Sequence, residues 1–254
     1  MLREIVDRKQ EDLKFFRLPR REEMEHHSLE KALAFAANHD GIGLIAEVKR
    51  ASPSKGPLAE NLDVVARAKA YEAGGADAIS VLTDGPYFQG SITDLINVKQ
   101  AVNVPVLRKD FIIDDRQIEE SARIGADAVL LIASILDPDH LKDMAKMAHA
   151  LGLETLVEVH TEEETNALLE VYEPPLVGIN NRDLQTFATD INQTVTISET
   201  IPTQSLIVSE SGIHSADDVG VIARAGAKAM LIGERLVADE DPETTIPDLK
   251  KGAR

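Results

Sequence analysis

The segment 124–133, IGADAVLLIA, resembles two other segments of the chain, GGADAISVLT at 74–83 and AGAKAMLIG at 225–233. Each has a glycine after a helix-like run, followed by alanine and branched apolar residues. This pattern is typical of a helix end that leads into a buried parallel strand. The glycines of the first two segments, Gly75 and Gly125, are 50 residues apart, and the third follows 101 residues later. A unit of about 25 residues fits both spacings and has the size of one strand with one helix.

The chain from Gly43 onward has room for about eight units of this size. Apolar runs rich in alanine and branched residues recur along it and predict buried strands. The predicted strands are 43–49, 76–83, 104–110, 126–133, 154–160, 176–181, 205–210 and 227–233.

Helical patterns lie between these runs, for example at 61–73 and 138–151. Eight strands alternating with helices favour a TIM barrel, (β/α)8, over a doubly wound sheet, which usually has fewer strands. We predict one α/β domain over residues 1–254. It consists of an N-terminal helical extension at 1–42, with one or two helices, and eight βα units at 43–254.

The composition restricts the partners that the protein can have. Lys and Arg number 27 and Asp and Glu 44, which gives a formal net charge of −17. So acidic a protein is not expected to bind nucleic acid or an anionic membrane. The most apolar stretch, AVLLIASIL at 128–136, is far shorter than the roughly 18 residues of a membrane span. There is no signal-peptide core. We expect a cytoplasmic protein that acts on a small molecule, as a monomer or weak homodimer.

Metal and thiol chemistry are also not expected. The chain has no cysteine, which excludes disulfides, thiolate catalysis and cysteine-ligated metal. Its seven histidines show neither HxH nor HExxH spacing. We therefore predict a site without metal and without cofactor.

Polar residues gather where the predicted strands end, and chemistry collects at this end of such barrels. Charge on the last residues of an apolar run is costly unless it is paired or functional. Asp84, Asp110 and His160 are expected to be structural. The stronger candidates form a ring of two lysines and three glutamates that would supply acid and base groups together, namely Glu47, Lys49, Lys109, Glu158 and Glu210.

Glycine-containing turns follow the last two predicted strands. Ser211-Gly212 follows the seventh strand and Gly233-Glu234 the eighth. In TIM barrels, turns at these positions commonly bind phosphate through backbone N–H groups. The alternative is that Gly212 and Gly233 are ordinary turn glycines; their position in the repeat favours the phosphate pocket.

Six motifs together resemble the indole-3-glycerol phosphate synthase family, and the resemblance covers essentially the whole chain. The motifs are EVKRASPSKG at 47–56, VPVLRKDFIID at 104–114, LVEVH at 156–160, GINNRDL at 178–184, VSESGI at 208–213 and LIGE at 231–234. The resemblance implies a lyase of tryptophan biosynthesis that uses no cofactor. The implied reaction closes the pyrrole ring of 1-(2-carboxyphenylamino)-1-deoxyribulose 5-phosphate, with loss of CO₂ and water.

The resemblance also implies roles for the ring of charges. Lys109 would be the general acid that protonates the ribulose carbonyl, and Glu158 the base in the dehydration. Lys49 would hold the substrate carboxylate or phosphate, or share the acid role. The remaining implied catalytic residues orient the lysines or hold substrate hydroxyls: Glu47, Asn180 and Glu210.

Further residues would bind the two ends of the substrate. The phosphate would meet Ser211, Gly212, Gly233 and the backbone of Glu234, and Ser52 and Arg182 would support the pocket. The aromatic ring would be flanked by Phe88, Phe111 and Leu131, although core packing is the more expected role of Leu131. Pro53 would stiffen the loop of Ser52 and Ser54 beside the site. After LIGE the family commonly has a small residue; this chain has Arg235, which we expect to point outward.

Two other readings remain open. One is a non-catalytic barrel that binds a sugar phosphate. The other is an Amadori-type phosphoribosyl isomerase; phosphoribosylanthranilate isomerase, however, relies on a Cys/Asp pair, and this chain has no cysteine.

Overall fold

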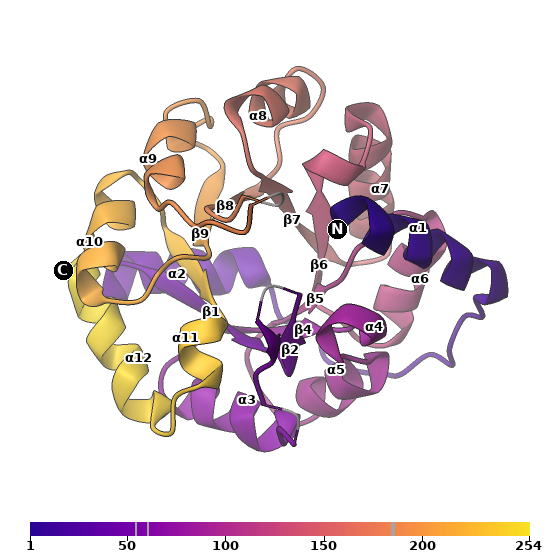
Figure 1. Ribbon diagram of the computed structural model, residues 1–254, viewed down its shortest axis with the longest axis horizontal. Helices are drawn as coiled ribbons and strands as arrows, with labels where there is room; N and C mark the ends of the chain where they lie inside the picture. Colours follow the sequence, from indigo (N-terminus) through magenta and orange to yellow (C-terminus); the bar gives the residue numbers. More distant parts are fainter. Residues whose placement is uncertain (54, 60, 184–185) are drawn as a thin grey trace.

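The computed structural model describes residues 1–53, 55–59, 61–183 and 186–254. Eight parallel strands close into a barrel in the order β1-β10-β9-β8-β7-β6-β5-β4 (Figure 1). Each lies within a predicted range, and the predicted TIM barrel is confirmed. The strands are β1 Gly43–Val48, β4 Ala78–Leu82, β5 Val106–Lys109, β6 Ala128–Ile132, β7 Glu154–Val159, β8 Leu176–Asn180, β9 Leu206–Glu210 and β10 Ala229–Ile232.

Helices surround the barrel as an outer ring (Figure 1). The longer ones are α3 Val64–Ala73, α5 Ile92–Lys99, α6 Asp115–Arg123, α7 Pro138–Ala150, α8 Glu162–Leu169, α9 Asn192–Ser198, α10 Ala216–Arg224 and α12 Pro242–Lys250. Short helices follow β4 and β10: α4 Gly85–Phe88 and α11 Glu234–Val237. Single 3₁₀ turns lie at η1 Leu13–Phe15, η2 Ala133–Ile135 and η3 Lys251–Ala253.

The glycines of the repeat end their helices for a conformational reason. Gly75, Gly125 and Gly226 follow α3, α6 and α10 and have φ values of 90°, 80° and 100°. Left-handed backbone of this kind favours glycine, which has no Cβ to clash. The repeat seen in the sequence is therefore a repeat of helix ends.

Two apolar layers hold the barrel together. Alternate strand residues point outward against the helices or inward into the barrel. On β6, Val129 and Leu131 pack in the outer layer, whereas Leu130 and Ile132 belong to the inner layer. This alternation determines which residues of a strand can contact a ligand at the open carboxyl end of the barrel.

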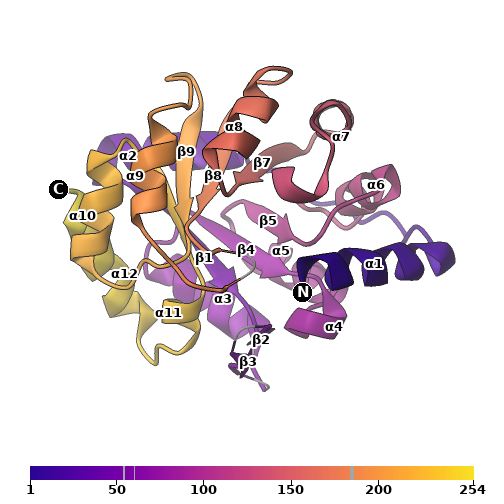
Figure 2. The ribbon, with the colours of Figure 1, turned by 45° about the horizontal axis from the view of Figure 1, so that its top comes forward.

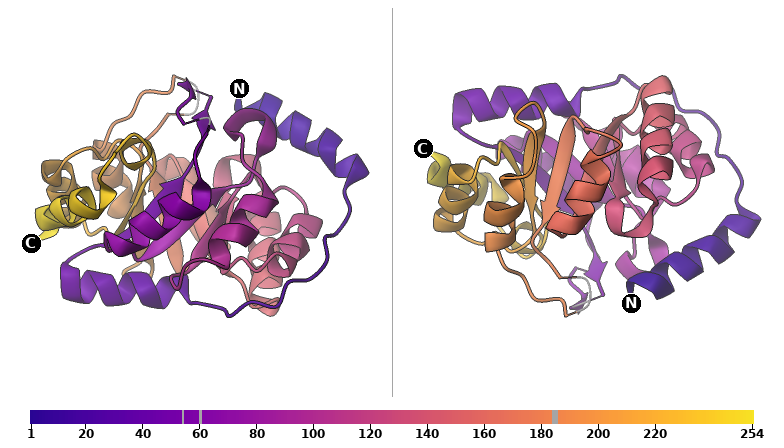
Figure 3. Two further views of the ribbon diagram at one scale, coloured as in Figure 1. Left: turned by 90° about the horizontal axis from the view of Figure 1, so that it is seen from below. Right: turned by 90° about the horizontal axis from the view of Figure 1, so that it is seen from above.

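The N-terminal extension forms two helices at opposite ends of the barrel, α1 Leu2–Asp12 and α2 Leu29–Asp40 (Figure 3). Leu29 and Leu33 of α2 are fully buried in the inner layer and close the amino end of the barrel. Helix α1 lies at the carboxyl end, on the side that carries α4 and α6 (Figure 2). The predicted extension is confirmed; its division between the two ends is not evident from the sequence.

A two-stranded hairpin, β2 Ala51–Ser52 with β3 Gly56–Pro57, projects from the barrel after β1 at the same end as α1 (Figure 3). It contains the Ser-Pro segment, of which Ser54 lies outside the described residues. Within the described ranges, no helix is long and apolar enough to cross a membrane.

Candidate active site

A cavity opens at the carboxyl ends of the strands. Fourteen of the fifteen site residues expected from the sequence line it: Glu47, Lys49, Ser52, Phe88, Lys109, Phe111, Glu158, Asn180, Arg182, Glu210, Ser211, Gly212, Gly233 and Glu234. They come from both halves of the barrel and from the turns that follow the strands. The structure thus brings together residues that are far apart in the sequence.

The exception is Leu131. This residue is fully buried in the layer between the strands and the helices and does not line the cavity. Its neighbours Leu130 and Ile132 point into the barrel and line it instead. The expectation for Leu131 is therefore wrong by one position along β6. A shift of one residue along a strand moves the side chain from one face of the sheet to the other.

The two lysines and three glutamates at the strand ends lie in contact within the cavity. The Nζ atom of Lys109 lies 3.2 Å from Oε2 of Glu158 and 3.4 Å from Oε2 of Glu210. Nζ of Lys49 lies 3.0 Å from Oε1 of Glu47. All three glutamates are buried. Three carboxylates therefore face only two ammonium groups. Repulsion among the carboxylates raises the pKa of at least one of them and favours its protonated form.

The pKa values of the two carboxyls beside Lys109 diverge. Burial raises the pKa of Glu210, and the nearby Glu158 and Glu47 add to it, so that the pKa reaches about 8 despite Lys109. Burial also opposes ionisation of Glu158, but Lys109 and His160 outweigh it and hold its pKa below the ordinary value. Burial lowers the pKa of Lys109, and its three carboxylate neighbours more than reverse this. Near pH 7 the site holds an ammonium, a carboxylate and a protonated carboxyl side by side, which suits acid–base chemistry.

Two glycines leave space for these carboxylates. A Cβ at Gly178 on β8 would collide with Oε1 of Glu210, and a Cβ at Gly233 would collide with Oε1 of Glu47. Gly178 is a site residue that the sequence reasoning missed, although the GIN motif that contains it was noted. Gly233, expected at the phosphate, also leaves room for the carboxylate of Glu47.

The turn after β9 has an unusual backbone. Ser211 and Gly212 both have positive φ, 65° and 75°. The side-chain amide of Asn181 supports this turn by donating to the carbonyl of Ser211 at 3.0 Å and to Oγ of Ser209 at 3.0 Å. Successive N–H groups in such a turn form a concave anion site. Asn181 is fully buried, and the sequence reasoning assigned it no role.

Glu234 lies at the same edge of the cavity. Its carboxylate forms ion pairs with Arg182, at 3.0 Å, and with Lys55. A carboxylate would repel a phosphate, so Glu234 can help to bind one only through its backbone N–H at the start of α11. Arg235 pairs with Asp239 one turn further on, at 2.8 Å, while it also borders the cavity.

The opposite wall is apolar. The rings of Phe88 and Phe111 have centroids 6.0 Å apart and are tilted by 38°. Leu2 and Ile5 of α1 line the same cavity. The cavity therefore combines a polar wall with an apolar one, as a substrate with a phosphate at one end and an aromatic ring at the other requires.

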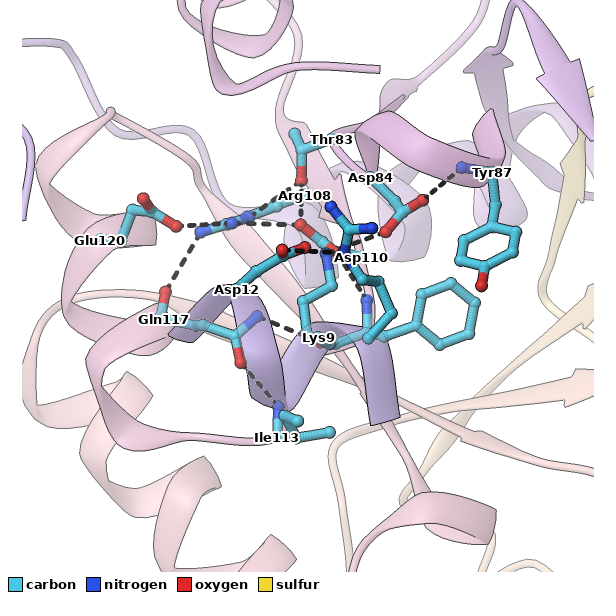
Figure 4. A network of polar contacts seen from close by, with 12 residues as sticks. Lys9, Asp12, Thr83, Asp84, Tyr87, Arg108, Asp110, Ile113, Gln117 and Glu120 are labelled. Atoms are coloured by element: carbon cyan, nitrogen blue, oxygen red, sulfur yellow. Dashed lines mark hydrogen bonds and ion pairs between the residues drawn. The ribbon is translucent and has the colours of Figure 1, made fainter. Parts of the chain in front are cut away.

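The residues expected to be structural are buried around this site. Asp84 and Asp110 pair with Lys9 of α1, a residue that no motif pointed to (Figure 4). His160 lies beside Glu158.

The described part of the chain contains no group of three or more His, Cys, Asp or Glu side chains that could hold a metal ion.

Comparisons with known proteins agree with this geometry. The family model described as "Indole-3-glycerol phosphate synthase" matches residues 2–249. The indole-3-glycerol phosphate synthase of Geobacillus kaustophilus is 51% identical over 246 residues, 97% of this chain and 95% of that protein. The enzyme of Halalkalibacterium halodurans with the same name is 50% identical over 252 residues, 99% of this chain and 97% of that protein.

More distant solved structures share the fold alone. Thiamine phosphate pyrophosphorylase from Pyrococcus furiosus has a TM-score of 0.61 at 16% identity, over 84% of this chain and 96% of that chain. N-acetylmannosamine-6-phosphate 2-epimerase from Clostridium perfringens has a TM-score of 0.62 at 16% identity, over 85% and 93%. On the family match and the identities of about one half over nearly the whole length, the chain belongs to the indole-3-glycerol phosphate synthase family.

Proposed function

We propose that this chain, a carboxy-lyase of tryptophan biosynthesis by its family, forms indole-3-glycerol phosphate in the cavity at the barrel mouth. Its substrate would be 1-(2-carboxyphenylamino)-1-deoxyribulose 5-phosphate. The observation that carries the proposal is the close contact of Lys109 with both Glu158 and Glu210, at 3.2 Å and 3.4 Å. An ammonium and a carboxylate this close together would both be within reach of one substrate atom, which supports the proposal.

The two walls of the cavity orient the substrate. The phosphate would lie against the N–H groups of the Ser211-Gly212 turn and of Gly233, with Arg182 beside it. The aromatic ring would lie between Phe88 and Phe111. This leaves the ribulose carbonyl between the two ends, next to the ammonium of Lys109. The carboxylate on the ring would face Lys49.

The first steps are ring closure and decarboxylation. The aromatic carbon that bears the carboxylate attacks the ribulose carbonyl carbon, and Lys109 gives its proton to the carbonyl oxygen. The carbon–carboxylate bond then breaks, and CO₂ leaves as its electron pair restores the aromatic ring. The Lys109 side chain is only 15% exposed, which limits the access of water that would otherwise compete for the proton.

Dehydration completes the pyrrole. The hydroxyl formed from the carbonyl takes a second proton, which Lys49 would give as the second acid of the site, and leaves as water. Glu158 takes the proton from the neighbouring carbon, and Lys49 regains its proton from solvent. Because Glu158 lies 3.2 Å from Lys109, the proton on Glu158 can return to that acid for the next turnover. Glu210 and Asn180 would hold substrate hydroxyls, and Glu47 would keep the ammonium of Lys49 in place.

The proposal is tested by mixing purified, chelator-treated protein with the substrate and recording indole fluorescence. The chain contains no tryptophan, so the protein background is low. A rise in indole signal with chelator present is expected. Bound substrate without a rise would favour the non-catalytic barrel, and turnover of a phosphoribosyl anthranilate instead would favour the isomerase.

We further propose that the protein acts in the cytoplasm as a monomer or weak homodimer. The formal net charge of −17 supports a protein that stays off nucleic acid and anionic membranes. Cell fractionation and sedimentation at several concentrations test the two statements.

A further inference from the structure

Helix α1 forms part of the apolar wall and is fastened at one point by charge. Met1, Leu2 and Ile5 line the cavity. Lys9 lies one helical turn beyond Ile5, on the same face of the helix. Its Nζ atom lies 2.9 Å from Oδ2 of Asp84 and 2.7 Å from Oδ1 of Asp110 (Figure 4).

The contact is sheltered from water. The Lys9 side chain is 13% exposed and those of both aspartates are 2% exposed. Burial lowers the pKa of Lys9, but Asp110 and Asp84 reverse this and raise it above its ordinary value. Within the described ranges, Lys9 is the one cation paired with Asp84, whereas Asp110 also pairs with Arg108 at 3.2 Å. Loss of Lys9 would leave Asp84 buried without a counter-charge, which proteins tolerate poorly.

Each aspartate leads to one of the two phenylalanines. Oδ1 of Asp84 accepts a hydrogen bond of 3.0 Å from the N–H of Tyr87 and so caps α4, whose last residue is Phe88 (Figure 4). Oδ1 of Asp110 accepts one of 2.8 Å from the N–H of Phe111. A single ammonium therefore joins α1 to both backbone segments that present the aromatic rings.

Asp110 is fixed by other contacts as well. Its Oδ2 accepts 2.6 Å and 3.2 Å hydrogen bonds from Thr83 and Arg108. Burial would raise the pKa of Asp110, yet Lys9 and Arg108 lower it to about 2, so it stays ionised. The barrel side of the contact is therefore rigid, and α1 is the part that Lys9 holds.

We propose that Lys9 is a positioning residue that fixes the aromatic wall of the cavity, holding α1 against the segments of Phe88 and Phe111 so that the site selects a ligand with an aryl ring. The inference deepens the proposed function and rests on it. The phosphate-side turn after β9 and helix α11 lie on the other side of the barrel from α1 (Figure 1). Lys9 therefore acts on one end of the substrate and not on the other.

The test compares Lys9→Met with Lys14→Met. Lys14, close to α1, pairs with Glu11 in an exposed position and serves as the matched control. Two probes are titrated: the substrate reduced at its carbonyl, which carries the aryl ring, and glycerol 3-phosphate, which does not. In Lys9→Met the dissociation constant of the reduced substrate should rise about tenfold or more. That of glycerol 3-phosphate, and both values in Lys14→Met, should stay unchanged.

Turnover and hydrogen exchange supply further readouts. Lys9→Met should raise KM more than it lowers kcat, and Lys9→Arg, which keeps the cation, should recover most of the loss. In Lys9→Met, backbone amide hydrogen exchange should become faster in residues 2–12 and 85–88 together. The exchange rates of the barrel strands should not change. Asp84→Asn offers the same comparison from the barrel side should Lys9→Met fail to fold.

An unchanged dissociation constant for the reduced substrate in Lys9→Met would overturn the inference while leaving the proposed function intact. Equal weakening of both probes would also overturn it, since Lys9 would then support the fold in general. Wild-type protein that neither turns over the substrate nor binds the reduced substrate would overturn both the inference and the proposed function.

Discussion

The Nε2 atom of His160 lies 3.3 Å from Oε1 of Glu158, whereas Lys109 lies beside the other oxygen, Oε2. The Nδ1 atom of His160 lies 3.4 Å from Oε2 of Glu164. Burial would lower the pKa of His160, but Glu158 and Glu164 raise it to about 10. The imidazole is therefore charged near pH 7, and the carboxylate proposed as the base is flanked by two cations.

Replacing His160 by asparagine should move the acid limb of the kcat–pH profile to higher pH. The carboxylate of Glu158 loses one of its two cationic neighbours, so its pKa rises and the base is protonated earlier as the pH falls. KM should change little, because His160 does not line the cavity. The measurement is kcat as a function of pH in the acid range. The control is His39→Gln, at an exposed position of α2. If the acid limb of His160→Asn stays at the wild-type pH, His160 has no effect on the base and serves only in packing.

Replacing Lys109 by alanine should lower kcat by about 10²–10⁴-fold, the range for loss of a general acid. The substrate should still bind within a few-fold of the wild-type affinity, because the two walls that hold its ends remain. Steady-state kinetics and a binding titration separate the two effects. Lys146→Ala, at an exposed position of α7, controls for the loss of a lysine. Near-normal kcat in Lys109→Ala would remove the acid role from this residue.

Replacing Glu210 by glutamine should stabilise the protein increasingly as the pH rises from about 4.5 to about 8. In this window the folded wild type keeps a proton on Glu210 that the unfolded chain has lost, so raising the pH favours unfolding of the wild type. Glutamine cannot ionise and escapes this effect. The difference in the free energy of unfolding should grow by up to about 1.4 kcal/mol per pH unit. Denaturant titrations at several pH values measure it, and a difference independent of pH would contradict the raised pKa.

Replacing Gly212 by alanine should raise KM through the phosphate end of the substrate. Gly212 has a φ of +75°, and a Cβ there would lie 3.3 Å from that of Thr189. The left-handed backbone alone costs a non-glycine residue about 1–2 kcal/mol. Gly152→Ala is the matched control, since Gly152 has a φ of +85° with nothing within 4 Å of the added Cβ. Both variants should lose stability. Only Gly212→Ala should bind glycerol 3-phosphate more weakly, as measured by its dissociation constant. Equal dissociation constants in the two variants would show that the phosphate binds elsewhere.

Much of the site could be predicted from the sequence because parallel strands bring their carboxyl ends to one edge. Charges that end apolar runs, such as Lys109 and Glu158, had to meet there once the eight strands were recognised. The glycines that end the helices mark the repeat because left-handed backbone restricts the choice of residue. These are local requirements, and a linear pattern of residue types can express them.

Other features depend on contacts between distant residues, and only the tertiary structure decided them. Lys9 and Asp110 are 101 residues apart in the chain and meet because α1 crosses to the carboxyl end of the barrel. Leu131 was placed in the cavity by resemblance, but the register of β6 turns it outward and presents Leu130 and Ile132 instead. The sequence by itself determined which residues end the strands. The closing of the barrel and the packing of α1 decided which of them face one another, because a side chain's partners follow from register and helix placement and not from its position in the chain.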